Sequence, residues 1–581
     1  MVTSITWKIG GEAGFGIISS GTMLARSLTR AGYIILATNE YPSLIRGGHN
    51  LVSIRISTEK FSAMRKGVDI LIALNKETVM LHKEELSKGA LIVYDPNAFD
   101  PSELSLPSSI KSIPVPFSQE VKNRNGEPIM RNTVALGASA RLLGLEFSSI
   151  QSVIEDQFKK KGEETVRNNV AMAKAGFDYV YAHFPNETSF FLSPPVSKEK
   201  QLVVNASEAV GLGAVRAGLK FAAIYPMTPI NALITFLADH AKRLGIVYKQ
   251  PEDEIAGINM AIGASVAGVR SMVATSGGGF ALMAEGLSLT GIIEVPLVID
   301  LGMRVGPATG MPTWTEQGEL LFAIRAGHGE FPRIVLAPAD AAEAYSMTID
   351  AFNLADRYQV PVILLTDKYI NESLWCVPFS HFQNDVSIDR GKLLNPGALD
   401  SVSSFARYEV NAEDGVSARS VPGMKNGQYY ANSYEHDEFG HVTEDPGKRK
   451  AMAEKRLRKF ITISKNTTPP TLYGQKSADM TFVTWGSTRG PVLEALEMSD
   501  YLMRGSSANL LHFSWMYPFP REATIDALKN AKRIIIVEQN ATSQFASLLR
   551  EHTGIEATDE INKYDGRPLY PDEIIERITK S

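Results

Sequence analysis

ATSGGG (Ala274–Gly279) runs directly into ALMAEG (Ala281–Gly286), and an apolar run, Pro296–Leu301, follows. This order predicts the end of a strand, a glycine turn, a helix and a second strand. Glycines let a ligand approach the backbone closely, because they carry no side chain. Open α/β sheets bind ligands at the carboxyl ends of their strands, so the stretch predicts an α/β fold with a site at this turn.

The loop after the second strand reads RVGPATGMPT, from Arg304 to Thr313. It places an arginine at the mouth of a strand and two threonines, Thr309 and Thr313, among glycines and prolines that make the loop rigid. A guanidinium in such a place can hold a carboxylate with two parallel hydrogen bonds. A surface arginine is the alternative, and it fits poorly with so constrained a loop.

An earlier motif, YPMTPI (Tyr225–Ile230), follows another apolar strand. Its two prolines fix the backbone and bend the chain where the strand ends, which leaves the Thr228 hydroxyl in a rigid corner. The motif predicts a ligand contact from this hydroxyl. The alternative is a structural turn in which Thr228 caps a helix that begins near Asn231.

Acidic residues 252–254 open the next helix, which then carries many small residues. Acidic side chains in a first helical turn are the usual response to the helix dipole, so this pattern can be purely structural. A buried carboxylate at Glu254 would instead suit a hydrogen bond to the nitrogen of a heterocycle. The residues alone leave both interpretations open.

The N-terminal segment carries a second glycine turn. A predicted strand, Ile5–Ile9, is followed by GGEAGFG (Gly10–Gly16) and by helical spacing from Ile17 to Thr29. Backbone N–H groups at such a turn can bind phosphate, but a tight turn without a ligand explains the pattern equally well. The candidates for phosphate contact are Gly11, Gly14 and Gly16, and Arg46 follows in a second glycine pair.

The length of 581 residues is too great for one hydrophobic core. Apolar runs alternate with helical stretches, and we expect three α/β domains at residues 1–185, 201–380 and 476–581. A helix from Leu202 to Leu219 should open the second domain. Between residues 381 and 475 the periodicity fades, apart from one basic helix around Lys448–Phe460, so this segment is expected to be a long covering connection.

Composition excludes several classes of function. The net charge of -5 gives no basic footprint for nucleic acid, and no apolar stretch is long enough to span a membrane, so we expect a soluble, cytoplasmic protein. Cys376 is the only cysteine, which excludes an internal disulfide or a cysteine-held iron–sulfur cluster. His436 and His441 lie in a polar stretch without helical spacing, and we expect no metal site on this chain.

Taken together and in this order, five motifs resemble the alpha subunit of a 2-oxoacid:ferredoxin oxidoreductase of the 2-oxoglutarate/2-oxoacid type, with a gamma domain fused at its N-terminus. They are GGEAGFG, YPMTPI, the acidic helix start ending in Glu254, TSGGGFALMAEG and RVGPATGMPT. The resemblance implies a gamma-type domain, a pyrimidine-type thiamine diphosphate domain and a transketolase C-terminal-like domain. Met227 and Gly278 depart from the residues usual in the family, without removing a polar group.

The resemblance also implies roles for single residues. Glu254 would be the catalytic residue that hydrogen-bonds the aminopyrimidine ring of thiamine diphosphate. The substrate carboxylate would be held by Thr228, Arg304 and Thr313. In the gamma-type domain, the phosphates of coenzyme A would be approached by Gly11, Gly14 and Gly16.

The implied reaction is the CoA-dependent oxidative decarboxylation of 2-oxoacids, 2-oxoglutarate and/or pyruvate, to acyl-CoA and CO2 with reduction of ferredoxin. Thiamine diphosphate, Mg2+ and a 4Fe-4S cluster would be carried mainly by a beta subunit, in an alpha-beta or (alpha-beta)2 assembly. Two alternatives compete with this function. The first is a stand-alone Rossmann-type oxidoreductase built on the N-terminal glycine turn, and the second is a non-catalytic assembly subunit.

Overall fold

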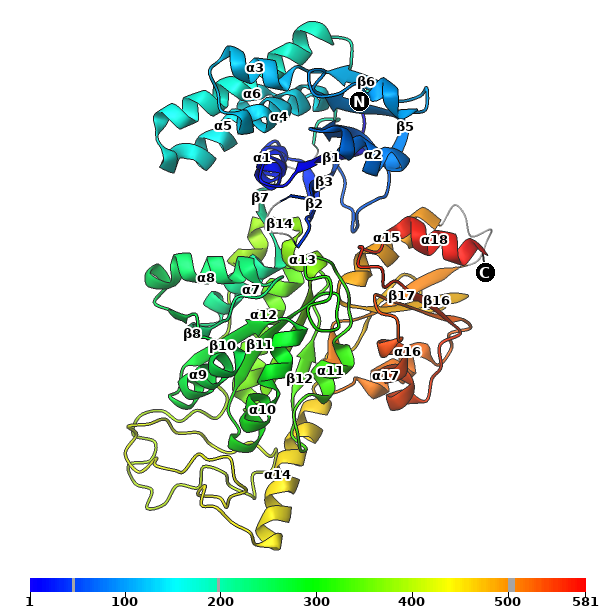
Figure 1. The fold of residues 1–581 in the computed structure, drawn as a ribbon. Helices are drawn as coiled ribbons and strands as arrows, with labels where there is room; N and C mark the ends of the chain where they lie inside the picture. Colours follow the sequence, from blue (N-terminus) through cyan, green and yellow to red (C-terminus); the bar gives the residue numbers. More distant parts are fainter. Residues whose placement is uncertain (44–46, 196–198, 500–506, 581) are drawn as a thin grey trace. The chain divides into compact units, whose positions relative to one another are not determined.

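The computed structural model describes residues 1–43, 47–195, 199–499 and 507–580 (Figure 1). The chain forms two compact units. The first unit consists of Met1–Asn205, Glu372–Gln383 and Tyr570–Glu576, and the second is made mainly of Ala206–Asn371 and Asn384–Leu569. Both units are layered α/β structures, as expected from the sequence. The predicted division into three domains, with boundaries near residues 185, 201, 380 and 475, stays a prediction.

The first unit is built on a mixed sheet with the strand order β6-β5-β4-β1-β3-β2-β14-β7. Its strands are β1 (Ser4–Glu12), β2 (Ile34–Glu40), β3 (His49–Ser57), β4 (Val68–Ala73), β5 (Leu86–Tyr94), β6 (Lys111–Pro114), β7 (Gln201–Val204) and β14 (Leu374–Pro378). Its main helices are α1 (Ile17–Arg30), α2 (Lys76–His82), α3 (Phe117–Asn123), α4 (Arg131–Leu143), α5 (Phe147–Phe158) and α6 (Glu163–His183).

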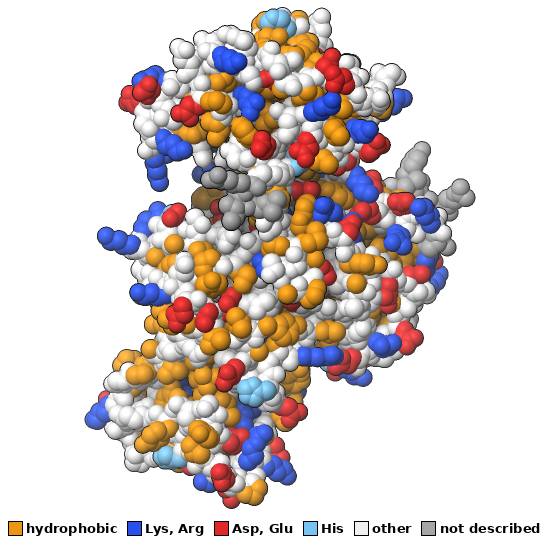
Figure 2. All heavy atoms as spheres, viewed as in Figure 1, with side chains coloured by type: hydrophobic (Ala, Val, Ile, Leu, Met, Phe, Trp, Pro, Cys, Tyr) orange, Lys and Arg blue, Asp and Glu red, His pale blue; other side chains and the backbone are white. Residues whose placement is uncertain are grey.

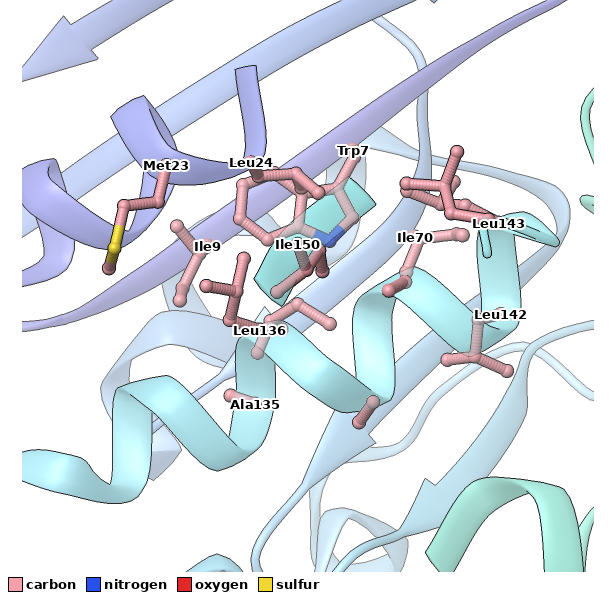
Figure 3. Packing of buried hydrophobic residues seen from close by; sticks show 14 of the residues in the cluster. Trp7, Ile9, Met23, Leu24, Ile70, Ala135, Leu136, Leu142, Leu143 and Ile150 are labelled. Atoms are coloured by element: carbon pink, nitrogen blue, oxygen red, sulfur yellow. The ribbon is translucent and has the colours of Figure 1, made fainter. Parts of the chain in front are cut away.

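The core of this unit lies between the sheet and the helices. Trp7 and Ile70 come from neighbouring parallel strands and pack against Leu24, Leu136 and Ile150 of three different helices (Figure 3). All five side chains are buried. The indole nitrogen of Trp7 donates to the Ser139 hydroxyl at 3.1 Å, so the one polar atom of this large side chain is satisfied inside the core.

Three strands of the first unit, β2, β7 and β14, were not predicted from the sequence. The helix expected from Leu202 is wrong at its start, because Gln201–Val204 is a strand. This strand pairs with β14, whose residues lie more than 160 positions later in the chain. Helix α7 (Ala206–Arg216) begins only after it. Cys376 lies in β14, half-buried, and burial raises the pKa of its thiol.

The second unit contains two sheets. The larger has the order β18-β12-β13-β11-β10-β8-β9 and is parallel except for β18. Its strands are β8 (Leu219–Ala223), β9 (Val247–Lys249), β10 (Arg270–Thr275), β11 (Leu297–Met303), β12 (Ile334–Leu336), β13 (Pro361–Asp367) and β18 (Trp515–Tyr517). The helices between them are α8 (Asn231–Leu244), α9 (Glu254–Val266), α10 (Gly277–Ile293), α11 (Leu320–Arg325), α12 (Ala341–Tyr358) and α13 (Lys368–Glu372).

The smaller sheet has the order β15-β17-β16-β19-β20. Its strands are β15 (Thr471–Tyr473), β16 (Met480–Trp485), β17 (Ala508–Phe513), β19 (Ile534–Glu538) and β20 (Asp559–Asn562), with helices α15 (Arg489–Ser499), α16 (Arg521–Leu528) and α17 (Gln544–Thr553). The last helix of the chain is α18 (Pro571–Lys580), and its residues up to Glu576 belong to the first unit. Both sheets share one hydrophobic core, in which Val273 and Ile299 of the larger sheet join Trp485 and Phe513 of the smaller one. The two sheets therefore form a single packed body.

Residues 384–445, which lie inside the connection predicted at 381–475, are irregular, and α14 (Pro446–Ser464) includes the predicted basic helix around Lys448–Phe460. Asp356, which is buried on α12, anchors part of this connection. It forms ion pairs with Arg270 at 2.8 Å, with Arg390 at 2.8 Å and with Arg419 at 3.0 Å. Two of these arginines belong to the connection, so the connection is held by charge as well as by packing.

Glu294, the residue that ends α10, anchors the other part of the connection. Its carboxylate is buried, accepts from Lys455 at 2.6 Å and is also paired with Lys459. Burial raises the pKa of Glu294, but the two lysines outweigh this effect, so that the pKa lies below its usual value. A charge this deep persists only when it is paired, and α14 supplies the partners.

Within the described part of the chain, no helix is long and apolar enough to cross a membrane. The cytoplasmic location stays a prediction.

Candidate functional site

Three parallel strands end at the same edge of the larger sheet. β8, β10 and β11 are neighbours, and they are followed by the predicted turn at Thr228, the glycines at 277–279 and the loop that begins at Arg304. Arg304 Nη1 donates to the backbone carbonyl of Thr228 at 2.9 Å, across the end of β10. The structure therefore brings together two of the candidates that are 76 residues apart in the sequence.

Arg304 is a buried cation with an incomplete set of partners. Its exposed fraction is 9%, which rules out the surface-arginine alternative. Among the described residues it makes one hydrogen bond, although a guanidinium carries five N–H donors. Burial lowers the pKa of Arg304, and the nearby carboxyl of Glu319 raises it. The remaining donors suit an anion with two oxygens.

The loop from Arg304 to Thr313 folds back on itself. Val305 donates from its backbone to the carbonyl of Trp314 at 3.2 Å, and Met311 donates to the carbonyl of Val305 at 3.1 Å. Thr313 is 4% exposed, and its hydroxyl is buried without a hydrogen-bond partner among the described residues. Thr309 lies on the exposed tip of the loop. The Thr313 hydroxyl is therefore a buried polar group without a described partner. The folded loop brings Thr313 close to Val305, the residue after Arg304.

Thr228 does not cap a helix. α8 begins at Asn231 after Ile230, and no side chain caps its first turn. The Thr228 hydroxyl is half-buried and lies 3.4 Å from the Asn231 side-chain amide, from which it accepts a long hydrogen bond. The capping alternative is therefore wrong, and the hydroxyl keeps capacity for a further partner.

Asp253 and Glu254, at the acidic start of α9, have different roles. Asp253 is the cap of α9 and accepts from the backbone of Ala256 at 2.8 Å, so the purely structural role belongs to Asp253. Glu254 is 3% exposed and accepts from the Thr275 hydroxyl at 3.3 Å. A side chain on Gly279 would overlap both groups. The glycine turn thus makes room for the buried carboxylate.

Two further groups at this edge were missed by the sequence analysis. Ser276, just before α10, has a buried hydroxyl without a partner among the described residues. The Glu319 carboxyl fills the space beside Gly277, where a Cβ atom would lie 2.5 Å from its Oε1. Glu319 Oε2 is also buried without a described partner. The acidic pair in TEQGEL directly after the Arg304 loop was the available signal for Glu319.

The environment of Glu319 favours its neutral form. Burial and the neighbouring carboxyl of Glu316 raise the pKa of Glu319 to about 8, and the charge of Arg304 only partly opposes them. The site therefore contains a carboxyl that is protonated near neutral pH and can donate a hydrogen bond. Strongly raised pKa values of this kind concentrate at functional sites.

The N-terminal glycines have different local roles. Gly11 lies inside β1, and a Cβ atom there would lie 3.0 Å from Leu74 and 3.1 Å from Ile17, so packing explains its missing side chain. Gly14 is exposed with a φ of 93° and open space beside it, and Gly16 precedes α1 with a φ of 73°. The turn thus has open space beside Gly14, while Gly16 is half-buried beside Asn132 and Ile129. Arg46 lies outside the described residues.

The histidine pair in the connection does not form a metal centre. His436 is fully buried and lies 2.9 Å from the carbonyl of Asp437 and 3.1 Å from that of Ile292. His441 is on the surface near the Asp437 carboxylate. Across the described ranges, no group of three or more histidine, cysteine or acidic side chains is placed to hold a metal ion.

Comparison with known proteins matches this arrangement to one group of enzymes. The family described as pyruvate flavodoxin/ferredoxin oxidoreductase, thiamine diphosphate-binding, matches residues 212–455, and the family described as pyruvate ferredoxin/flavodoxin oxidoreductase matches residues 6–179. The first therefore covers the strand edge described above, and the second covers the N-terminal glycine turn.

Relatives that align over the full length of this chain belong to the same group of enzymes. The alpha subunit of 2-oxoacid:ferredoxin oxidoreductase 2 from Aeropyrum pernix is 35% identical over 99% of this chain and 97% of its own. An alpha subunit of 2-oxoacid:ferredoxin oxidoreductase from Sulfolobus sp. is 33% identical over 99% and 96%. A solved 2-oxoglutarate:ferredoxin oxidoreductase from Magnetococcus marinus, with 2-oxoglutarate, coenzyme A and succinyl-CoA bound, is 32% identical over 100% of both chains, with a TM-score of 0.92.

The raised pKa of Glu319 predicts a pH-dependent stability. From its usual value of 4.5 up to about 8, the folded chain keeps a proton that the unfolded chain has lost, so this group lowers stability as the pH rises. Glu319→Gln cannot ionise. Between about pH 5.5 and pH 8, the variant should gain roughly 3 kcal/mol relative to the unchanged chain. Thermal unfolding at both pH values measures the gain.

The matched control is Glu330→Gln, which removes an exposed carboxyl from the loop after α11. The free energy of unfolding of this control should change with pH as it does in the unchanged chain. The same pH dependence in Glu319→Gln would show that Glu319 is already ionised in the folded protein.

Proposed function

The chain belongs to the 2-oxoacid:ferredoxin oxidoreductases as an alpha subunit, and we propose which of its residues hold the substrate, the cofactors and the partner subunit. The enzyme carries out the CoA-dependent oxidative decarboxylation of a 2-oxoacid to acyl-CoA and CO2, with ferredoxin as the electron acceptor. The relative from Magnetococcus marinus supports 2-oxoglutarate as the substrate, and pyruvate is the second candidate.

One observation carries the assignment of the substrate site. Arg304 is buried with donors left over, and the Thr313 hydroxyl is buried without a described partner. Leaving such groups unpaired is costly, so the site is built for a ligand that pairs with them. A 2-oxoacid carboxylate accepts two hydrogen bonds from the guanidinium and one more from a hydroxyl. We assign Arg304, Thr313 and Thr228 to this carboxylate.

Thiamine diphosphate is the cofactor that Glu254 and the space beside Gly279 fit. Gly279 leaves the space that the Glu254 carboxylate occupies, and the Ser276 hydroxyl has no described partner. When bound, thiamine diphosphate supplies the carbon nucleophile and the electron sink that decarboxylation requires. Glu254 would hold a proton at the pyrimidine ring nitrogen. Arg304 would meanwhile orient the substrate, and the buried strand ends would exclude water.

The remaining groups are assigned to other parts of the assembly. The chain has one cysteine, so a 4Fe-4S cluster needs thiolates from another subunit, and we place it with Mg2+ on the beta subunit. Coenzyme A is assigned to the N-terminal unit, where the open backbone at Gly14, and Gly16 at the start of α1, would approach its phosphates. Gly11 has a packing role there and is the weakest of the three glycine assignments.

An exposed apolar surface on α9 and α10 supports the docking of the beta subunit. Figure 2 shows hydrophobic side chains gathered around the region of these two helices, which Figure 1 locates. Ile255 and Leu282 are each 49% exposed, and they line a hollow of about 590 Å3 together with Arg449 and Arg456. Helices that are apolar on all sides are normally buried. We propose that the beta subunit covers this surface.

The first prediction from the proposed function tests the substrate site in the complex with the beta subunit. Arg304→Ala removes charge-assisted hydrogen bonds of about 1.5–3 kcal/mol, so the KM for the 2-oxoacid should rise roughly 10- to 150-fold. Arg304→Lys should recover part of this loss, because it keeps the charge. Steady-state dye reduction over a panel of 2-oxoacids measures both and identifies the preferred substrate.

Arg325→Ala is the control, since this arginine is exposed and pairs with Glu551 on the surface. An unchanged KM in Arg304→Ala would contradict the assignment. If the isolated chain bound NAD and turned over a substrate without a partner, the stand-alone oxidoreductase would replace this function. Unchanged activity in both Glu254→Gln and Arg304→Ala would favour a non-catalytic subunit.

A second prediction concerns the cofactor. Gly279→Ala places a methyl group where the Glu254 carboxylate and the Thr275 hydroxyl now lie, so it should displace Glu254. We expect thiamine diphosphate to bind at least roughly tenfold more weakly, as measured by calorimetric titration of the cofactor-free complex. Glu254→Gln should have an effect in the same direction. Gly278→Ala meets nothing closer than 4.0 Å and is the control; equal binding by both alanine variants would overturn the prediction.

A third prediction concerns the partner. Leu282→Glu puts a charge into the proposed interface and should weaken association with the beta subunit by more than about 2 kcal/mol, a loss of roughly 30-fold. Leu81→Glu changes a leucine of α2 that is 53% exposed, and it should leave association unchanged. Light scattering of the co-expressed subunits measures the complex. Full association of Leu282→Glu would place the beta subunit elsewhere.

A further inference from the structure

The larger sheet holds the loop that carries Arg304 and Thr313 only near the two ends of the loop. Arg304 donates to the Thr228 carbonyl, and the Thr315 hydroxyl accepts from the backbone of Tyr369 at 3.2 Å, while residues 306–311 between them form an exposed tip. A side chain that orients a reacting carboxylate must nevertheless be held within a fraction of an ångström. Some other part of the chain must therefore fix the loop. We call residues 304–315 the carboxylate loop.

A tight turn near the C-terminus lies against this loop. The backbone N–H of Thr315 donates to the carbonyl of Gly566 at 3.1 Å. Gly566 has a φ of 79°, and a Cβ atom there would lie 3.2 Å from Trp314 and 3.3 Å from both Met311 and Val305. The backbone at Gly566 is thus in close contact with both ends of the carboxylate loop.

The next residue adds a second contact. The guanidinium of Arg567 lies over the Trp314 ring, 3.2 Å from its centroid. A cation held over an indole face is attracted to it, and the planar guanidinium stacks well on the ring. Asp565 keeps the turn in shape by accepting from the backbone of Arg567 at 2.9 Å. Trp314 is therefore held between the carboxylate loop and the turn at 565–567.

Gln317 locks the chain directly after the loop. It is fully buried, its backbone N–H donates to the carbonyl of Gln539 at 2.7 Å, and its Oε1 accepts from the backbone of Gln539 at 3.0 Å. Its side-chain amide also donates to the carbonyl of Trp485 at 3.2 Å. Trp485 and Gln539 stand at the carboxyl ends of β16 and β19. The strand ends of the smaller sheet therefore hold the chain directly after the carboxylate loop.

We propose that Gly566, Arg567 and Gln317 are positioning residues that set the carboxylate loop, so that the C-terminal sheet determines how tightly the substrate carboxylate is held. The proposal rests on the assignment of Arg304 and Thr313 to that carboxylate. None of the three positioning residues needs to touch the substrate. They act through Trp314 and the backbone on either side of it.

The test uses the complete enzyme with its beta subunit and compares two glycine variants. Gly566→Ala puts a methyl group against Val305, Met311 and Trp314. Gly554→Ala places the same residue at a φ of 73° with nothing within 4 Å, so it carries the same backbone cost without touching the loop. We expect Gly566→Ala to raise the KM for the 2-oxoacid by roughly tenfold to 100-fold, with thiamine diphosphate affinity unchanged, and Gly554→Ala to leave KM unchanged.

Arg567→Ala should raise KM in the same way, and Arg567→Lys should recover part of it, because a lysine keeps the cation over Trp314. Amide hydrogen exchange gives a readout that does not depend on turnover. Residues 305–314 should exchange faster in Gly566→Ala and Arg567→Ala than in the unchanged enzyme, while β16 and β19 keep their protection. Loss of protection throughout the C-terminal sheet would mean unfolding and would contradict a positioning role.

Arg304→Ala in the same series separates the two proposals. If Arg304→Ala raises KM while Gly566→Ala and Arg567→Ala leave KM and loop exchange unchanged, the positioning proposal is wrong and the substrate site stands. If Arg304→Ala itself leaves KM unchanged, the substrate assignment is wrong, and the positioning proposal falls with it.

Discussion

Parallel pairing of β8, β10 and β11 is the constraint on which the site depends. Parallel strands end at one edge, so the segments that follow them must meet there, however far apart they lie in the chain. The hydrogen bond from Arg304 to the carbonyl of Thr228 crosses the middle strand of the three. Glu254 reaches the same edge because Gly279, at the start of α10, has no side chain.

Buried ionisable groups of two kinds stand out among the described residues. Asp356 and Glu294 are surrounded by cations from the connection and from α14, and they hold the long irregular segment in place. Arg304 and Glu319 are also buried, but polar atoms of both have no described partner. A paired group of the first kind serves the fold, and we propose that a ligand completes the second kind.

In the proposed site, the alpha subunit acts by holding polar groups in fixed positions. Arg304 and Thr313 present donors, Glu254 presents an acceptor, and a shared core joins the larger sheet to the smaller one. That core places Trp485 and Gln539 where they grip Gln317, next to the carboxylate loop. Under the proposed positioning role, the C-terminal sheet contributes to substrate binding without supplying a residue that touches the substrate.

The sequence by itself determined the α/β class, most strands of the parallel sheets and the helix that opens at Glu254, and it selected Thr228 and Arg304 as candidates. Local patterns suffice for these, because periodicity and turn residues act over a few positions. Only the tertiary structure decided that β7 pairs with β14, that Glu319 fills the space beside Gly277 and that Gly566 supports the carboxylate loop. Each of these depends on residues between about 40 and more than 250 positions apart, and no local pattern encodes such a contact.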